Sequence, residues 1–254
     1  MRFLVIYKKY IKLAMVCLVC VVLLSLNFGG GTSAQVYFGY APRLVPIYNV
    51  DTTEKRVAIS FDSAWGADKT TKIVDIVKEY GFNATFFLVG FWVDDYPDMV
   101  KYVMDHGLEI GTHSNTHPDF TTLSASQMRL ELETSIEKIE KITNKKVELF
   151  RAPYGAYNNQ MLNITGEMGL KTIQWDVDTL DWKGLSGIEI CERVMSRVKE
   201  GSIILCHNNS DHILDALPLL LERLKNAGYT VGSVGELIYQ SDYYIDNLGL
   251  QHKN

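Results

Sequence analysis

Six side chains of types that bind metal ions or transfer protons occupy similar places in this sequence. Each lies at the end of a short apolar or β-branched run or a few residues beyond it; they are Asp62, His113, His117, Arg151, Asp178 and His207. The carboxyl ends of parallel strands meet at one edge of a sheet or barrel, where binding sites form. We therefore expect these six side chains to converge on one site.

His113 and His117 are four residues apart, a spacing that places two imidazoles on one face of a helical turn. Two such rings can bind one cation. A pair of this kind alone is more often a surface feature, but its place beyond a strand end, with Asp62 ending another strand, favours a metal site. Asp62 has the chemistry of a general base, a metal ligand or a helix cap.

Arg151 and His207 suit the control of protons. Pro153 keeps Ala152 extended in the segment that begins with Arg151. A guanidinium beside a carboxylate keeps that carboxylate ionised, although a purely structural salt bridge is an alternative. An imidazole titrates near neutral pH, so a protonated His207 can donate a proton.

The elements that must position these residues alternate along the chain. Seven apolar runs predict strands at residues 56–61, 84–89, 108–112, 147–151, 172–177, 201–206 and 229–234. Segments with helical spacing separate them, such as Ile213, Leu217, Leu220, Leu221 and Leu224. The pattern predicts an α/β fold with mainly parallel strands, either a barrel or a doubly wound sheet. Ser124 with Gln127 indicates a capping box, and Pro97 a first helical turn.

The N-terminal segment differs in composition from the rest. Residues 1–34 combine a basic start, an apolar run and small residues near the end, which predicts a signal peptide or an N-terminal membrane anchor. Residues 35–54 are expected to form a linker or strap, and residues 241–254 a C-terminal tail. Without residues 1–34 the chain has 21 Lys and Arg against 30 Asp and Glu, which disfavours nucleic-acid partners.

The strand-end motifs resemble those of the polysaccharide deacetylases, the NodB-homology domain of carbohydrate esterase family four. The resemblance covers roughly residues 55–240. It implies a distorted (β/α) barrel of seven to eight strands and a divalent metal, zinc or cobalt. The segments around Asp62 and at residues 216–238 resemble the PdaB-type subgroup of spore-forming bacteria, which implies a role in sporulation.

The resemblance also implies residue roles. His113 and His117 would hold the metal, Asp62 would be the base paired with Arg151, and His207 would be the acid. Asp178 would hold His207, with Asp176 and Asp181 as alternatives. The Tyr154 N–H would stabilise the oxyanion and Leu205 would line the pocket for the acetyl methyl group; Trp182 would form a wall of the groove, with core packing as the alternative.

One position departs from the family pattern. The family has two consecutive Asp residues, a base and then a metal ligand, where this chain has Asp62 and Ser63. A hydroxyl is a poor replacement for a carboxylate on a dication, so we expect weak metal binding, with Asp62 itself as a further ligand. Asp68 is a conceivable substitute, but its position favours a helix cap.

The resemblance implies hydrolysis of N-acetyl groups on N-acetylglucosamine or N-acetylmuramic acid units of cell-wall glycan, or of chitin-like oligomers. The alternatives are a glycan-binding pseudoenzyme that lost its chemistry with the second Asp, and a different metal hydrolase on a similar barrel. We expect an extracytoplasmic monomer, secreted or attached to the membrane only through its N-terminal segment.

Overall fold

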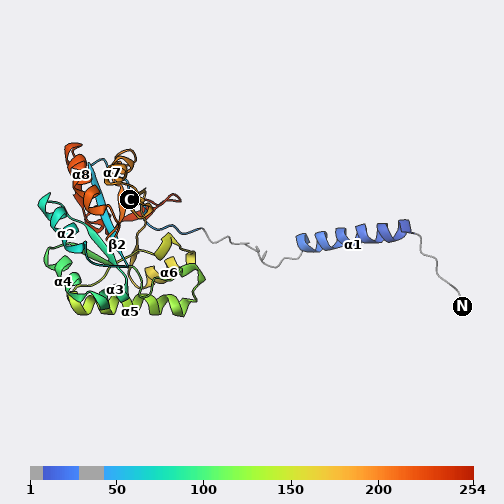
Figure 1. Cartoon of the computed structure of the whole chain (residues 1–254). Coiled ribbons are helices and arrows are strands. Elements are labelled where there is room, and N and C mark those ends of the chain that lie inside the picture. Colours follow the sequence, from blue (N-terminus) through green and yellow to red (C-terminus); the bar gives the residue numbers. More distant parts are fainter. Residues whose placement is uncertain (1–7, 29–42) are drawn as a thin grey trace. The chain divides into compact units, whose positions relative to one another are not determined.

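The computed structural model describes residues 8–28 and 43–254, which belong to two separate compact units. In the first unit, residues Lys8–Phe28 form helix α1 (Figure 1). No helix within the described residues has both the length and the apolar character needed to cross a membrane. Parts of the predicted leader and linker, residues 1–7 and 29–42, lie outside the described residues, so cleavage and anchoring stay predictions.

A curved parallel sheet is the centre of the second unit. Its strand order is β6-β5-β4-β3-β2-β8-β7, and β9 also pairs with β2; all these pairs are parallel. The strands are β2 (Arg56–Ser63), β3 (Thr85–Leu88), β4 (Glu109–Thr112), β5 (Leu149–Phe150), β6 (Lys171–Thr172), β7 (Val177–Asp178), β8 (Ile203–His207) and β9 (Thr230–Gly232). The sheet forms a partly open barrel with helices around it (Figure 1), which confirms the predicted fold class.

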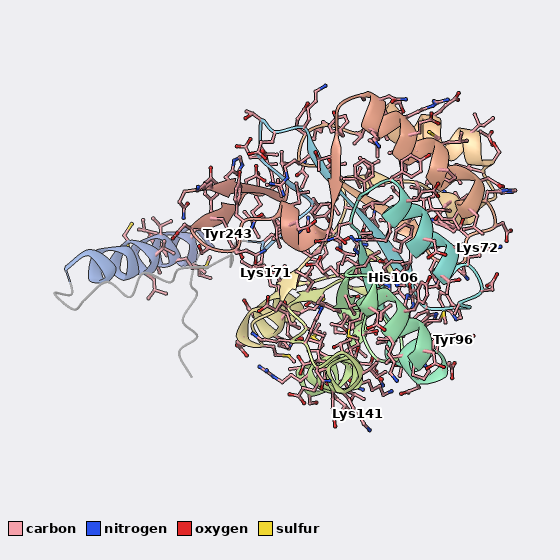
Figure 2. All side chains as sticks on the ribbon, turned by 90° about the vertical axis from the view of Figure 1, so that its left-hand side faces the viewer. Lys72, Tyr96, His106, Lys141, Lys171 and Tyr243 are labelled. Atoms are coloured by element: carbon pink, nitrogen blue, oxygen red, sulfur yellow. The ribbon has the colours of Figure 1, made fainter. Side chains whose placement is uncertain are left out.

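Amphipathic helices cover the outside of the barrel. They are α2 (Thr70–Glu79), α3 (Gly90–Asp95), α4 (Pro97–Asp105), α5 (Ala125–Thr143), α6 (Asn159–Glu167), α7 (Gly187–Met195), α8 (Ile213–Asn226) and α9 (Val234–Leu237), with 3-10 turns η1 (Phe120–Thr122), η2 (Pro153–Gly155) and η3 (Asp181–Lys183). All five residues of the predicted stripe on α8 are buried. Lys72 on α2 and Lys141 on α5 point outward (Figure 2). The apolar face of each helix thus drives its packing.

Local signals in the sequence correctly predicted where two helices begin. Ser124 and Gln127 form both hydrogen bonds of a capping box at the start of α5. Pro97 occupies the first turn of α4, where its missing N–H costs nothing. Asp68 does not cap α2, however, because that helix has Lys69 at its N-cap position and no capping hydrogen bond from a side chain.

The predicted strand 172–177 is wrong as one element. It divides into β6 and β7, which lie at opposite ends of the sheet order. Between β6 and β7, Ile47 forms an isolated β-bridge with Ile173, and the carbonyl of Ile47 accepts a 2.7 Å hydrogen bond from the N–H of Gln174. The N-terminal strap thus takes the backbone partners that a continuous strand would have needed.

The strap and the C-terminus form a second sheet of three strands, β1 (Asn49–Val50), β11 (Leu250–Lys253) and β10 (Tyr243–Ile245), in that order. Residues 241–254 therefore include two paired strands. Gly201 lets the strap approach the barrel, since its φ is +78° and an added Cβ would lie 1.8 Å from the carbonyl oxygen of Val50.

Asp176 ties the strap to the barrel. Its Oδ2 accepts hydrogen bonds from Ser202 Oγ at 2.9 Å and Asn49 Nδ2 at 3.4 Å, and its Oδ1 accepts one from the N–H of Ile203 at 2.9 Å. We predict that Asp176→Ala lowers the free energy of unfolding by about 2 kcal/mol, because these donors lose a charged acceptor. Urea denaturation measures the change. As a control, Glu222→Ala at an exposed position on α8 should change the free energy of unfolding by no more than about 0.5 kcal/mol. Equal effects of the two substitutions would contradict the role of Asp176.

Candidate active site

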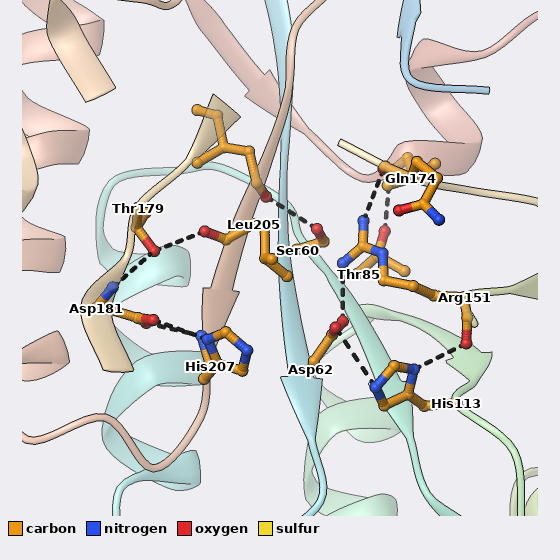
Figure 3. A network of polar contacts seen from close by, with 12 residues as sticks. Ser60, Asp62, Thr85, His113, Arg151, Gln174, Thr179, Asp181, Leu205 and His207 are labelled. Carbon is orange, nitrogen blue, oxygen red and sulfur yellow. Dashed lines mark hydrogen bonds and ion pairs between the residues drawn. The ribbon is translucent and has the colours of Figure 1, made fainter. Parts of the chain in front are cut away.

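A buried ion pair lies at the carboxyl ends of the barrel strands. Arg151, which follows β5, is 0% exposed and Asp62 on β2 is 7% exposed. Arg151 Nη1 donates a 2.8 Å hydrogen bond to Asp62 Oδ1, and Nη2 donates one of 3.1 Å to the carbonyl of Gln174 (Figure 3). The guanidinium carbon also lies 4.2 Å from the ring centroid of Phe87. These contacts place Arg151 beside Asp62, as predicted from the sequence.

The pair keeps Asp62 ionised. Burial is the largest single effect and would raise the pKa of this carboxyl, but the charge and hydrogen bond of Arg151, together with the charges of His113 and His207, outweigh burial and hold the pKa below its ordinary value. Arg151 occupies only Oδ1, and the other oxygen, Oδ2, faces His113. An ionised carboxylate with one oxygen outside the ion pair has the chemistry of a general base.

His113 is held in one tautomer. Its Nδ1 lies 2.8 Å from the carbonyl oxygen of Arg151, which can only accept a hydrogen bond, so Nδ1 carries the proton (Figure 3). Its Nε2, 3.5 Å from Asp62 Oδ2, is then left with a lone pair. Burial lowers the pKa of His113 despite the charge of Asp62. A neutral imidazole fixed in this way by its other nitrogen is the form that binds metals.

His117 does not share a helical face with His113. The chain from 113 to 117 is a loop beyond β4, in which Ser114 has a φ of 72° and His117 a φ of 60°. The helical turn predicted from their spacing is therefore wrong. The loop still brings the two rings to a centroid distance of 4.9 Å in an edge-on arrangement. Burial, followed by the charge of His113, lowers the pKa of His117 to about 4, so this ring is also neutral near pH 7.

Glu131 on α5 fixes this loop through hydrogen bonds. Its Oε2 accepts hydrogen bonds from the N–H groups of Asn115 and Thr116 at 2.9 and 2.8 Å, and its Oε1 accepts one from Thr116 Oγ1 at 2.7 Å. The sequence offered no signal for this role, because an acid on the polar side of an amphipathic helix is ordinary.

Asp181, not Asp178, holds His207. Asp181 Oδ1 lies 2.7 Å from His207 Nδ1, and Oδ2 accepts the His207 N–H at 2.8 Å (Figure 3). Asp178 instead accepts a hydrogen bond from the N–H of Leu180, and Asp176 belongs to the strap contacts. Leu180 has a φ of 52°, which turns the chain back so that the next residue reaches His207.

The pKa of His207 is raised above its ordinary value. Burial is the largest single effect and acts to lower it, but the hydrogen bond to Asp181 and the charges of Asp181, Asp62 and Asp178 together outweigh burial. Asp62 and His207 are also register partners on adjacent strands. The site therefore sets an ionised base beside an imidazole that stays protonated to higher pH, a suitable pair for acid–base hydrolysis.

Aromatic and apolar side chains surround this centre. Tyr154 is 70% exposed, and its ring lies 4.7 Å from that of His117. Trp182 is 60% exposed, so the core-packing alternative is wrong for this residue. Leu205 is buried two positions before His207 on β8, and strand alternation places both on the same face. Sequence reasoning missed Trp65, an exposed ring 5.1 Å from that of His117.

The residues fit a divalent cation only in part. His113 Nε2 and the ring of His117 supply neutral imidazole nitrogens, which suit zinc and cobalt. The buried Oγ of Ser63 and Nδ1 of His117 have no hydrogen-bond partner within the described residues, as expected of atoms that face a cation when one is bound. Those residues contain no arrangement of three His, Cys, Asp or Glu side chains suited to hold a metal. The donor set is thus that of a metal site with one carboxylate too few.

The contacts of His207 yield a test. We predict that Asp181→Asn lowers the pKa of His207, because the substitution removes both the charged acceptor and its field. Asp178→Asn should lower it much less. Because the pKa of His207 is higher in the folded than in the unfolded state, protonated His207 stabilises the fold. This contribution is complete at pH values below the unfolded pKa of about 6.5 and is lost as the pH rises through the folded pKa. An NMR pH titration of the imidazole measures the pKa; a larger shift with Asp178→Asn would contradict the assignment.

Known proteins are similar to this chain in both sequence and fold. The family model for polysaccharide deacetylase matches residues 49–173. Peptidoglycan-N-acetylmuramic acid deacetylase PdaA of Bacillus subtilis is 33% identical over 79% of this chain and 78% of its own length. The uncharacterized protein YlxY of the same organism is 33% identical over 76% of this chain, but the match spans only 60% of YlxY.

The crystal structure of BA3943 from Bacillus anthracis, described as a carbohydrate esterase family 4 pseudoenzyme, aligns with a TM-score of 0.75 at 33% identity, over 83% of this chain and 73% of that one. A BA3943 mutant described as having restored enzymatic activity aligns with a TM-score of 0.74 at 37% identity, over 76% and 71% of the two chains. The chain belongs to the polysaccharide deacetylases, the hydrolases of carbohydrate esterase family 4.

Proposed function

We propose that this protein removes N-acetyl groups from N-acetylglucosamine or N-acetylmuramic acid units of cell-wall glycan by metal-assisted hydrolysis. The observation that carries the proposal is the adjacency of Asp62, ionised by Arg151, and His207, whose pKa Asp181 raises. A binding protein has no physical need for a base and an acid tuned in opposite directions. The name of PdaA supports the choice of a peptidoglycan substrate.

The chain's own residues supply the proton transfers. Asp62 takes a proton from the attacking water, and Arg151 keeps the carboxylate ionised and oriented for that step. The backbone N–H of Tyr154 donates to the oxyanion of the tetrahedral intermediate. His207 gives its proton to the departing sugar amine, so that the C–N bond breaks to acetate and a free amine, and Asp181 stabilises the imidazolium before transfer.

His113 and His117 would hold the divalent cation, zinc or cobalt, with Asp62 as a possible further ligand. When bound, such a cation polarises the amide carbonyl and lowers the pKa of water. Leu205 would contact the acetyl methyl group, and Trp182 would line the groove.

A second candidate is a glycan-binding pseudoenzyme. Ser63, in the place of the usual ligand Asp, favours it, as does the likeness to the BA3943 pseudoenzyme. Both candidate functions involve a glycan as the binding partner and no nucleic acid. A cell-wall glycan lies outside the cytoplasm, which supports secretion of the protein or its anchoring through residues 1–34. The two candidates differ only in whether acetate is released.

We predict that the purified protein with added zinc or cobalt releases acetate from peptidoglycan fragments or N-acetylglucosamine oligomers. Asp62→Asn should slow the release by about 100-fold or more, because the general base is lost. Mass spectrometry detects each lost acetyl group. Asp105→Asn, the same change at an exposed position at the end of α4, should retain activity. An inactive wild type on both substrates would leave the pseudoenzyme as the function.

We predict that Ser63→Asp tightens zinc binding by at least about tenfold, because it returns a carboxylate to the two imidazoles. Isothermal titration calorimetry measures the affinity for zinc directly, whether or not the protein is active. Ser63→Asn adds a side chain of similar size without the charge and should not tighten binding. An affinity unchanged by Ser63→Asp would show that another ligand already occupies this place.

A further inference from the structure

Exposed aromatic side chains gather at the mouth of the barrel. Within residues 43–254, four aromatic side chains are exposed: Trp65, Tyr154, Trp182 and Tyr244. The first three lie on the segments that follow β2, β5 and β7, at the carboxyl ends of the strands. Single exposed apolar residues are ordinary, but this concentration beside one polar centre indicates a binding surface.

The loop that carries Trp65 is fixed by buried side chains. The carbonyl of the next residue, Gly66, accepts a 2.7 Å hydrogen bond from Trp92 Nε1 and one of 2.9 Å from Asn208 Nδ2. Trp92 is 0% and Asn208 1% exposed. Trp65 nevertheless remains 57% exposed. A large ring on a fixed backbone loses little conformational entropy when a ligand covers it.

The surroundings of Trp65 leave room for a flat ligand. Its ring meets His117 at an interplanar angle of 64° and Phe91 at 46°, at centroid distances of 5.1 and 6.5 Å. Neither contact is a parallel stack. Tyr154 approaches the same His117 ring, at 4.7 Å and 76°, so Trp65 and Tyr154 both lie next to this imidazole.

The two ends of the site differ in their aromatic residues. Trp182 directly follows Asp181, which holds His207, whereas Trp65 and Tyr154 contact His117 in the loop that also carries His113. Figure 3 shows Asp62 between His207 on one side and His113 on the other. A glycan whose acetamide reaches Asp62 therefore has aromatic surface available on both sides of the reacting sugar.

We propose that Trp65 forms a subsite that stacks on the pyranose ring next to the sugar that reacts, so that the protein selects glycan chains over single sugars. The inference rests on the proposed glycan-binding function but not on catalysis. The apolar C–H face of a β-linked N-acetylhexosamine suits an exposed indole, since a neutral ring buries apolar area without desolvating a charge. The acidic excess of the chain beyond residue 34 also favours a neutral sugar ring over a polyanion.

The test compares affinities along two ligand series, N-acetylglucosamine oligomers of one to six sugars and peptidoglycan glycan fragments of matched length. Titration calorimetry with a chelator present prevents turnover. We expect wild-type affinity to rise with chain length, and Trp65→Ala to weaken binding of the longer ligands by about tenfold while leaving the single sugar unchanged. Trp65→Phe should restore most of the loss.

Tyr244→Ala is the matched control, an exposed ring on β10 outside the barrel mouth, and should bind like the wild type. Equal affinities of wild type and Trp65→Ala for the longer ligands would overturn the subsite and leave the proposed function intact. A wild type that binds neither series at any length would also overturn the subsite, whereas acetate release with added metal tests the proposed function separately. Circular dichroism of each variant checks that its fold is retained.

Discussion

The buried contact between Arg151 and Asp62 organises the whole site. Burying two charges costs several kcal/mol each, which their attraction offsets only if hydrogen bonds satisfy the remaining atoms. Arg151 meets this condition in part, because Nη1 and Nη2 donate to Asp62 and to the carbonyl of Gln174, whereas its Nε has no partner within the described residues. The carbonyl of Arg151 in turn fixes His113. One residue after β5 thus ties together β2, the loop beyond β4 and the segment between β6 and β7. Loss of either charge would leave the other buried and unpaired.

Both reactive groups of the site have a pKa shifted by a neighbouring opposite charge, but the two shifts have opposite signs. On β2, the cation Arg151 lowers the pKa of the carboxyl of Asp62; on β8, the anion Asp181 raises the pKa of the imidazole of His207. Each reactive group has a buried partner of opposite charge, and the register of β2 with β8 sets the two reactive groups side by side. The parallel sheet places the two reactive groups, and the segments that follow β5 and β7 supply their partners. Groups fixed in this way need less reorganisation during reaction.

The barrel and most of the site follow from the sequence, because apolar runs and strand ends carry both signals. The failures occur where the backbone departs from regular periodicity. The helical turn predicted for His113 and His117 is a loop with left-handed residues, and Leu180 turns left-handed so that Asp181 replaces Asp178 as the partner of His207. Nothing in residue spacing reveals a positive φ at Leu180 or His117, since such strain persists only when tertiary contacts maintain it.

Ser63 changes what the site requires of a cation. With Asp62 balanced by Arg151 and both His113 and His117 neutral, the buried centre carries no uncompensated charge in the absence of metal. A carboxylate at position 63 would add a buried negative charge that a cation or a bound proton would have to neutralise. The serine therefore lets this part of the barrel form independently of metal and leaves the tuned acid and base in place. We expect the same serine to weaken metal binding and to free the fold from dependence on a metal.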